Sequence, residues 1–305
     1  MANLHSQLLL LLILVVSLFL ASTQPSLAHS RKLILQSPKK VADSHHFGSL
    51  NDVRLYLERF GYKEKPLDND LTKDTLTTES SLYAAISLYQ QTNHLNVTGK
   101  LDSETVARMM TPRCGMPDVF PSGGKGGSRY SKLLHVVGRY KAFDNMIPWT
   151  KVNITYTFAT TIPLVSLEAL RKSCQGAFQH WAAVTPFHFL EAGKGEHGDL
   201  TIGFYSGDHG DGSPFDGPGH VWAHAFAPQD GRVHFDGSEQ WSTTTPTSEE
   251  IDLESVALHE IGHALGLNHS IDQNAVMYAY IGQGVVKREL QQDDIDGIKS
   301  IYPPK

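Results

Sequence analysis

The chain has 305 residues, of which 40% are hydrophobic and 19% charged, and its formal net charge is −6. This apolar content excludes a disordered chain, and 26 glycines and 15 prolines without a short period exclude a collagen-like one. Two cysteines cannot build a disulfide-rich scaffold, and the mild acidity argues against nucleic acid as a partner.

The N-terminus carries an apolar block from Leu8 to Leu20. It is shorter than the roughly 20 residues that a transmembrane helix needs, and small residues suited to cleavage follow at Ala21 and Ala28. We therefore expect residues 1–28 to be a signal peptide and the mature protein to be secreted, with no transmembrane span. An uncleaved anchor is the alternative, because no Lys or Arg precedes the block.

Secretion would expose three Asn-x-Ser/Thr triplets to glycosylation. The candidates are Asn96 and Asn153, although such short triplets also arise by chance. We expect the third triplet, at Asn268, to stay unmodified because it overlaps a metal motif described below. The chain ends without an apolar segment for a lipid anchor, so we expect a soluble extracellular monomer.

Residues 45–111 have the periodicity of helices. Apolar side chains recur at spacings of three and four in three runs, Leu50–Phe60, Leu82–Tyr89 and Val106–Met110. Gly61 ends the first run, and Asp102 or Ser103 can cap the third. The pattern predicts a small three-helix domain.

A short motif at residues 112–118, Pro-Arg-Cys-Gly-Met-Pro-Asp, follows these helices. The glycine-rich segment 121–128 comes next and indicates a flexible linker, so we place a domain boundary near residue 129. Cys114 in the motif could bind zinc as a thiolate or pair with Cys174, as cysteines of secreted chains commonly do. Cys174 falls on the apolar face of a predicted helix, where cysteine commonly serves as a small hydrophobic residue.

The remaining residues, 130–305, mix strands and helices. Period-two alternation over 152–158 predicts a strand, and residues 164–183 have helical spacing. Further elements follow in order: short strands near 187–190, 199–205, 221–226 and 232–235, then helices near 252–266 and 288–301. This order predicts an α+β or α/β domain with its sheet built early.

The strongest chemical signal is the run from His259 to His269. His259 and His263 are four residues apart, so they project from one face of a helix and can share one zinc ion. Gly266 can take a left-handed conformation, end the helix and return His269 as a third ligand. Three ligands leave one tetrahedral position open, where Glu260 could act as general base on a water molecule.

A second cluster of His, Asp and Gly lies between residues 199 and 241. Three histidines and one aspartate could complete a closed tetrahedral zinc site: His209, Asp211, His224 and His234. Nearby carboxylates and loop carbonyls suit calcium. A solvated polar loop is the alternative that spacing alone allows.

Together these motifs resemble the matrixins, the matrix metalloproteinase branch of the metzincin clan. The HExxHxxGxxH signature is typical of metzincins, Ser270 after the third histidine resembles the matrixin branch, and Met277 lies where the family has its Met-turn. Ala279 stands where the family has proline, so the wall of the primary specificity pocket does not carry over. The resemblance covers roughly residues 45–305, and the minimal layout, without a hemopexin-like domain, is similar to plant-type matrixins and to the shortest animal ones.

The resemblance implies an α+β fold, in which a twisted, mixed five-stranded sheet with three helices follows a three-helix propeptide. The propeptide would span residues 29–129 and the catalytic domain residues 130–305. Cys114 would be the inhibitory fourth ligand of the catalytic zinc, and Arg113 and Asp118 would pair to hold this cysteine switch at residues 112–118.

The second cluster resembles the family's structural zinc and calcium loops. Zinc falls on the four residues named above, and calcium on Asp216, Asp236, Glu239 and the main-chain oxygens of Gly217, Gly219 and Val221. A further calcium site would use Asp199, but this chain has Arg232 where the family has a second aspartate. The segment Trp222–Ala225 matches the edge strand that pairs with extended substrates.

We therefore expect a secreted, latent zinc endopeptidase of the extracellular space, cell wall or matrix. It would cleave extended peptides or proteins and be inhibited by its own propeptide. A non-catalytic, zinc-dependent wall- or matrix-binding protein is the alternative, against which the intact Glu260 argues. A cell-wall amidase is a third hypothesis, against which Ser270 and Met277 argue.

Overall fold

The computed structural model describes residues 47–62, 79–119, 143, 146–159, 162–193 and 195–303. The expected signal peptide and glycine-rich linker lie outside these residues. The described residues belong to one compact unit, His45–Lys305. None of the helices in the described ranges has the length and apolar character needed to cross a membrane.

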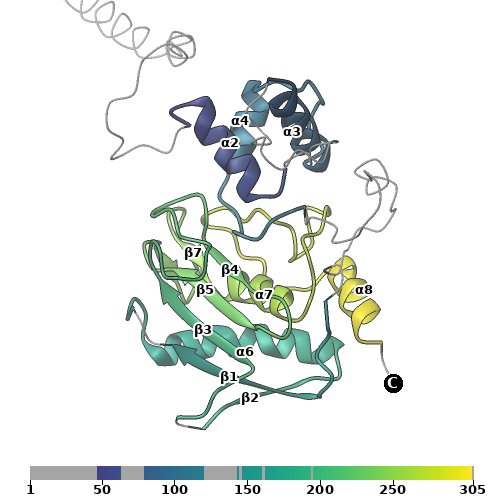
Figure 1. Cartoon of the computed structure of the whole chain (residues 1–305). Coiled ribbons are helices and arrows are strands. Elements are labelled where there is room, and N and C mark those ends of the chain that lie inside the picture. Colours follow the sequence, from purple (N-terminus) through teal and green to yellow (C-terminus); the bar gives the residue numbers. More distant parts are fainter. Residues whose placement is uncertain are drawn as a thin grey trace, which may run out of the picture. The chain divides into compact units, whose positions relative to one another are not determined.

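Three helices form the N-terminal part: α2 (Leu50–Arg59), α3 (Glu79–Thr92) and α4 (Ser103–Met109) (Figure 1). Ser49 and Asp102 cap α2 and α4, because each side chain accepts a hydrogen bond from a backbone amide in the first turn. Leu57 and Tyr89 are fully buried between these helices. The predicted three-helix domain is confirmed.

The second part contains a mixed five-stranded sheet, as expected. Its strands are β1 (Asn153–Ala159), β2 (His188–Glu191), β3 (Leu200–Tyr205), β4 (Ala223–Ala225) and β5 (Arg232–Asp236). The order is β2-β1-β3-β5-β4, and all pairs are parallel except β4 with β5. The antiparallel strand β4 therefore forms one edge, where another extended chain could pair with it.

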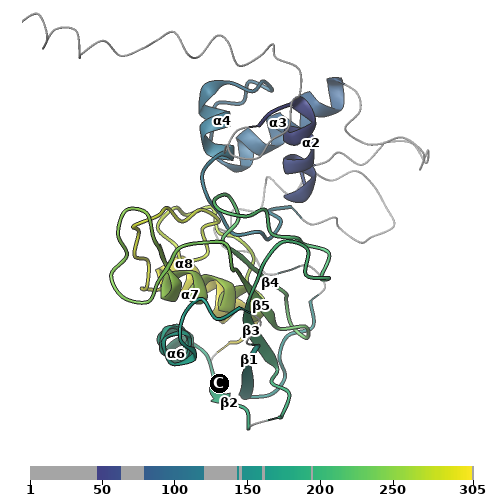
Figure 2. The ribbon, with the colours of Figure 1, turned by 90° about the vertical axis from the view of Figure 1, so that its left-hand side faces the viewer.

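Three helices accompany this sheet: α6 (Leu167–Val184), α7 (Leu253–Ala264) and α8 (Gln292–Ile301). Figure 2 shows α6 and α7 on the same face of the sheet. The indole Nε1 of Trp181 in α6 donates to the Leu258 carbonyl of α7 at 2.9 Å, which fixes the two helices together. The expected fold of a mixed sheet with three helices is thus confirmed.

Two details differ from the sequence-based expectations. A short parallel pair, β6 (Trp241–Ser242) with β7 (Ile251–Asp252), was not predicted, because two residues are too few to show a period. The last helix begins at Gln292 rather than near 288, and the backbone amide of its N-cap residue Gln291 donates to Asp294 Oδ2 at 2.8 Å. Helix α7, which carries His259 and His263, ends as predicted, because Gly266 adopts a left-handed φ of 110°.

The helical part and the sheet part share an apolar cluster. Phe215 and Val221, from loops of the sheet part, pack with the core of the three helices. The motif at residues 112–118 follows α4 in the chain, and its backbone bonds to Ala223 of β4 on one side and to Ala279 on the other. This docking brings Cys114 to the histidines.

Candidate metal centre

Helix α7 and the turn after it gather three histidines. His259 and His263 lie one helical turn apart, and their Nε2 atoms are separated by 3.1 Å. The chain turns at Gly266 and returns His269, whose ring centroid is 4.8 Å from that of His263. All three rings are buried. The structure thus brings together the three residues that the motif predicted as ligands.

Two of these rings are oriented by a hydrogen bond at Nδ1, the ring nitrogen on the side away from the shared centre. His259 Nδ1 contacts the Val276 carbonyl and His263 Nδ1 the Leu267 carbonyl, both at 2.7 Å. Because a carbonyl only accepts, each Nδ1 carries the proton and each Nε2 lone pair is free for a metal. Burial lowers the pKa of both rings well below the ordinary value, which keeps them neutral.

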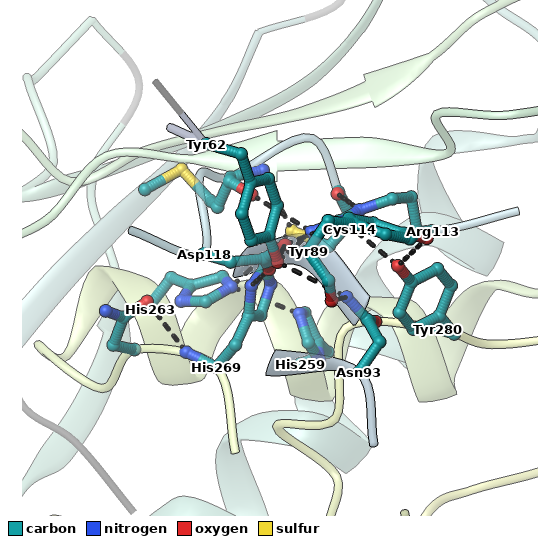
Figure 3. A network of polar contacts seen from close by, with 12 residues as sticks. Tyr62, Tyr89, Asn93, Arg113, Cys114, Asp118, His259, His263, His269 and Tyr280 are labelled. Atoms are coloured by element: carbon teal, nitrogen blue, oxygen red, sulfur yellow. Dashed lines mark hydrogen bonds and ion pairs between the residues drawn. The ribbon is translucent and has the colours of Figure 1, made fainter. Parts of the chain in front are cut away.

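Cys114 supplies a fourth donor at the same point. Its Sγ lies 3.5 Å from His263 Nε2, and the four potential ligand atoms lie within 4.8 Å of one another. Figure 3 shows the three histidine rings gathered beneath this sulfur. Both Cys114 and Cys174 are free and buried, so the structure does not form the alternative disulfide.

The donor set matches what zinc requires. Three neutral imidazoles and one sulfur are a common tetrahedral zinc environment. His269 Nε2 is buried with no hydrogen-bond partner in the described structure, which leaves its lone pair directed to the centre. Burial raises the pKa of the Cys114 thiol, so a thiolate there calls for a cation beside it. These residues can therefore hold zinc.

Arg113 and Asp118 clamp the loop that presents Cys114. Two hydrogen bonds join them, Nη2 to Oδ1 at 2.6 Å and Nη1 to Oδ2 at 2.9 Å, and both side chains are buried. Burial would raise the pKa of Asp118, but Arg113 and His269 hold it well below its usual range. The pair that the resemblance implied is therefore formed in the structure.

The backbone around Cys114 lies in a cleft between β4 and the Met-turn loop. On one side Gly115 N donates to the Ala223 carbonyl at 2.7 Å, and on the other Cys114 N donates to the Ala279 carbonyl at 2.9 Å. Arg113 forms a parallel bridge with Val221, just before the edge-strand segment. Residues 113–115 thus bond through their backbone to both of these elements.

Glu260 is fully buried beside this centre. Desolvation raises the pKa of Glu260 to about 8, against the opposing effect of the nearby Cys114 side chain. A carboxyl group with such a pKa can both take up and release a proton near neutral pH.

Met277 lies under α7, where the Met-turn was expected. Its backbone amide donates to Asp294 Oδ1 at 2.9 Å, and its carbonyl accepts from Ser270 N at 2.8 Å. A Cβ at Gly262 would lie 2.4 Å from Met277 Sδ. Glycine at this position of the motif therefore permits the close approach of the turn to the helix.

A second four-residue group also converges. Atoms of His209, Asp211, His224 and His234 lie within 4.8 Å of one another. Asp211 Oδ2 is 2.7 Å from His209 Nε2 and from His224 Nε2, and 2.9 Å from His234 Nδ1. Burial lowers the pKa of His224 and of His234 to about 4, so both are neutral at pH 7. Three imidazoles and a carboxylate suit a closed zinc site.

The carboxylates assigned to calcium lie close enough to raise one another's pKa. Desolvation first, then the neighbouring acids, raise the pKa of Asp236 to about 6 and of Glu239 to about 8. Asp216 contributes to both shifts, and Asp236 Oδ2 is buried with no hydrogen-bond partner in the described structure. Gly219 of the same loop lies beside Glu239, because its backbone amide donates to Glu239 Oε1 at 2.6 Å. Such a set of oxygens would be stabilised by a divalent cation.

Asp199 does not join this loop. Its carboxylate accepts from Lys151 Nζ at 2.5 Å and from Thr155 N at 2.8 Å. It precedes β3 at the end that faces Arg232, whereas Asp236 is at the other end of the neighbouring strand. Arg232 in turn pairs with Asp230. The structure therefore gives Asp199 a role in holding β1 to β3.

The glycosylation candidates Asn96 and Asn153 are both exposed. Asn268 is buried, and its Oδ1 accepts from His269 N at 2.8 Å. Its side chain is thus part of the turn that presents the third histidine, in line with the expectation that it is not modified.

Sequence reasoning missed a buried set of tyrosines above the centre. Tyr62 OH donates to Asp118 Oδ2 at 2.6 Å, and the hydroxyls of Tyr89 and Tyr280 are 3.0 Å apart. Arg113 Nη1 reaches Tyr280 OH at 3.3 Å. These residues, visible in Figure 3, come from segments far apart in the sequence, and no spacing pattern connects them.

The sheet, the helices and a three-histidine centre beside a buried glutamate define a zinc metallopeptidase. A family model described as Matrixin matches residues 148–303, and one described as a putative peptidoglycan binding domain matches residues 49–109. The chain is 38% identical to Metalloendoproteinase 1 of Glycine max, over 96% of each chain. It is 37% identical to Metalloendoproteinase 2-MMP of Arabidopsis thaliana, over 91% of this chain and 78% of the relative.

Similarity extends beyond plants. The chain is 38% identical to Matrix metalloproteinase-16 of Homo sapiens over 83% of its length, which corresponds to 41% of that longer protein. These matches, with the geometry above, show that the chain belongs to the matrixin family of zinc metalloendopeptidases.

Proposed function

We propose that this protein is a secreted, latent zinc endopeptidase that cleaves extended peptides or proteins outside the cell. The observation that supports this most is the convergence of Cys114 with the three histidines beside the buried Glu260. In this proposal residues 1–28 are the signal peptide, residues 29–129 the propeptide and residues 130–305 the catalytic domain.

Glu260 would perform the proton transfers of peptide hydrolysis. Zinc, when bound, supplies Lewis acidity, which lowers the pKa of water and polarises a carbonyl group. Glu260 in its charged form, which a cation bound beside it would favour, takes the proton from the attacking water as general base. It then returns the proton to the leaving amine. The other residues orient the reactants: the Nδ1 bonds of the histidines fix their rings, and β4 aligns the peptide backbone.

Latency would follow from the same geometry. While Cys114 is at the centre, its sulfur takes the position that a water molecule needs, and residues 113–115 occupy the peptide-binding edge. Removal of the propeptide would free both the fourth ligand position and the peptide-binding edge. We further propose a second, structural zinc at His209, Asp211, His224 and His234, and calcium at the Asp216–Glu239 loop.

The deciding experiment compares the wild-type chain with Glu260→Ala, after limited proteolysis of the purified full-length zymogen. We expect the wild type to cleave a casein-derived or quenched-fluorescent peptide, with activity lost to a zinc chelator and reduced by at least about 10²-fold in Glu260→Ala. Full activity in this variant would refute the role of Glu260. A wild-type protein that retains zinc but cleaves nothing would favour the binding-protein alternative.

Latency is tested by Cys114→Ser in the unprocessed chain. We expect this variant to cleave peptides without prior proteolysis, because a serine hydroxyl is a much weaker zinc ligand than a thiolate. Cys174→Ala is the matched control: it removes the other thiol, which is buried in α6 away from the centre, and should remain latent. Sustained latency of Cys114→Ser would contradict the cysteine switch.

A further inference from the structure

One side chain joins the two sides of the cleft that holds residues 113–115. The indole Nε1 of Trp222 donates to the Ile281 carbonyl at 2.8 Å, and both residues are buried. Trp222 directly precedes edge strand β4, and Ile281 belongs to the loop that follows the Met-turn. The bond therefore connects the two elements between which a peptide segment lies in the latent chain.

Trp222 is itself held in place. Its carbonyl accepts from the backbone amide of Asp236 in β5 at 2.8 Å, and its ring packs in the same apolar core as Ile281. Because protein cores are close-packed, a ring in this environment has little room to move. The indole N–H thus offers the loop a fixed donor that is anchored to the sheet.

Other contacts of the loop go to the propeptide. The Ala279 carbonyl accepts from Cys114 N at 2.9 Å. The hydroxyl of Tyr280 lies 3.0 Å from that of Tyr89. Cys114 and Tyr89 leave with the propeptide in the proposed activation. The bond from Trp222 stays, because both of its partners belong to the catalytic domain.

An extended peptide can bond to both sides of the cleft only if they stand a suitable distance apart. Neighbouring strands lie about 4.8 Å apart, so two elements that both bond to one strand are separated by about 9–10 Å. In the latent chain Gly115 N bonds to the Ala223 carbonyl on one side. Cys114 N bonds to the Ala279 carbonyl on the other. A substrate strand needs much the same separation whichever way it runs, because both parallel and antiparallel pairs form such bonds.

We propose that Trp222 is a positioning residue for peptide hydrolysis, whose indole N–H holds the loop at Ile281 at the separation from β4 that an extended substrate bridges. This inference rests on the proposed endopeptidase function. The Trp222 side chain is 1% exposed, so it acts through the two sides of the cleft rather than by touching the substrate. Without the indole N–H, the Ile281 carbonyl loses this donor and the loop is less firmly held to the sheet.

Loss of the indole N–H should therefore weaken the binding of peptides that reach both sides. We expect KM to rise by about 5-fold to 30-fold, which corresponds to the loss of about 1–2 kcal/mol from one buried hydrogen bond. A smaller fraction of folded protein would lower the apparent kcat and leave KM unchanged. A rise in KM thus separates a positioning role from a merely structural one.

The test uses the full-length zymogen activated by limited proteolysis and two quenched-fluorescent peptides with the same scissile bond. The long peptide extends several residues to each side of that bond, and the short one ends next to it. In Trp222→Phe we expect KM for the long peptide to rise by about 5-fold to 30-fold. The ratio of kcat/KM between the long and the short peptide should fall by a similar factor, because the short peptide forms few backbone bonds to either side.

Trp181→Phe is the matched control. It removes an indole N–H that is equally buried and donates to the Leu258 carbonyl at 2.9 Å, but that bond joins α6 to α7 and not the two sides of the cleft. This variant should keep the wild-type KM and the wild-type ratio between the two peptides.

A second variant and a second measurement guard against a folding defect. Trp222→benzothienylalanine keeps the shape of the indole and has sulfur in place of the N–H, and it is used if the phenylalanine variant does not melt as a folded zymogen. Hydrogen–deuterium exchange of residues 277–284 in the activated protein should be faster in either Trp222 variant than in Trp181→Phe.

The outcomes separate this inference from the function on which it rests. An unchanged KM in the Trp222 variants, an equal rise in Trp181→Phe, or exchange that is no faster would each overturn the role of Trp222 while leaving the endopeptidase intact. If the activated wild type cleaves neither peptide and no protein substrate, the endopeptidase function itself is overturned, and this inference with it.

Discussion

Asp118 Oδ1 lies 2.8 Å from His269 Nδ1, so a carboxylate of the propeptide motif orients a side chain of the candidate metal centre. The same carboxylate holds Arg113, the residue before Cys114. One group therefore positions the loop that carries the sulfur and one of the rings that the sulfur approaches. The Nδ1 atoms of His259 and His263 donate the equivalent bond to backbone carbonyls of their own domain, so of the three rings only His269 depends on the propeptide for it.

The first prediction concerns this carboxylate. Asp118→Asn keeps the shape but leaves the buried Arg113 guanidinium without its counter-charge, and breaking a buried pair in this way costs about 3–5 kcal/mol. We expect weaker docking of the motif, seen as a lower melting temperature of the zymogen and as peptide cleavage before proteolytic activation. Glu191→Gln, which breaks the more exposed pair with Arg171, is the control and should cost less than about 1 kcal/mol. Equal effects of the two variants would contradict the clamp.

The second prediction concerns metal removal. In the intact zymogen Cys114 is buried among the three histidines, so a thiol reagent should label neither cysteine. A zinc chelator should make Cys114 reactive, because loss of the cation removes what holds the sulfur in place. The measurement is mass spectrometry of alkylated zymogen with and without chelator, with Cys174→Ala to leave a single thiol. Rapid labelling of Cys114 without chelator would argue against zinc ligation.

The sequence predicted the parts of the site that obey a local period. His259, Glu260 and His263 follow from helical spacing, and Gly266 from the need to end the helix before His269. The bond between Asp118 and His269 joins residues 151 positions apart, and that between Tyr89 and Tyr280 joins residues 191 apart. Such contacts arise from how the two parts dock, which no local pattern records.

The expected role of Asp199 shows the limit of carrying residues over from a family. Asp199 matches one aspartate of the family's further calcium site, but Arg232 stands where the family has the second. Lys151 pairs with Asp199 instead, and Arg232 pairs with Asp230. Charge at the neighbouring positions, rather than the aspartate alone, decides whether a cation is needed there. The same reasoning favours calcium at Asp236 and Glu239, where no basic side chain is among the causes of the shifts of either pKa; Asp216 of the same loop, by contrast, pairs with Arg59 at 3.7 Å.

The third prediction concerns how the stabilisation of the fold by calcium depends on pH. In the folded protein the pKa of Asp236 is raised from 3.8 to about 6, and that of Glu239 from 4.5 to about 8. A raised carboxyl pKa means that the folded state binds the proton more tightly than the unfolded state does. The protonated carboxyl groups therefore add to the free energy of unfolding below about pH 4, and this contribution is lost as pH rises through about 6 and 8. Calcium favours the charged forms and should offset that loss.

We therefore expect the gain in melting temperature on adding calcium to grow from pH 5 to pH 8. At about 100 times its Kd, calcium should stabilise the fold by about 2.7 kcal/mol. The measurement is thermal unfolding of protein dialysed free of calcium, at constant zinc, with magnesium as the control cation. In Glu239→Gln the growth with pH should be smaller. A gain that is independent of pH would contradict the assignment.

The fourth prediction tests the approach of the Met-turn to α7. A Cβ added at Gly262 would lie 2.4 Å from Met277 Sδ and 2.8 Å from Trp181 Cζ2, so Gly262→Ala must displace one of two buried side chains. Overpacking of this kind costs about 1–3 kcal/mol, which should lower the melting temperature and shift the residues that flank the histidines. Gly282→Ala is the matched control, because its nearest contact would be 3.4 Å from Val285 Cγ2, an ordinary separation. If Gly262→Ala melts like the wild type, the turn is not packed against the helix as the structure shows. If the loss caused by Gly262→Ala is smaller in a Met277→Ala background than in the wild type, the clash with the Met-turn is the cause, because alanine has no atom at the place of the sulfur.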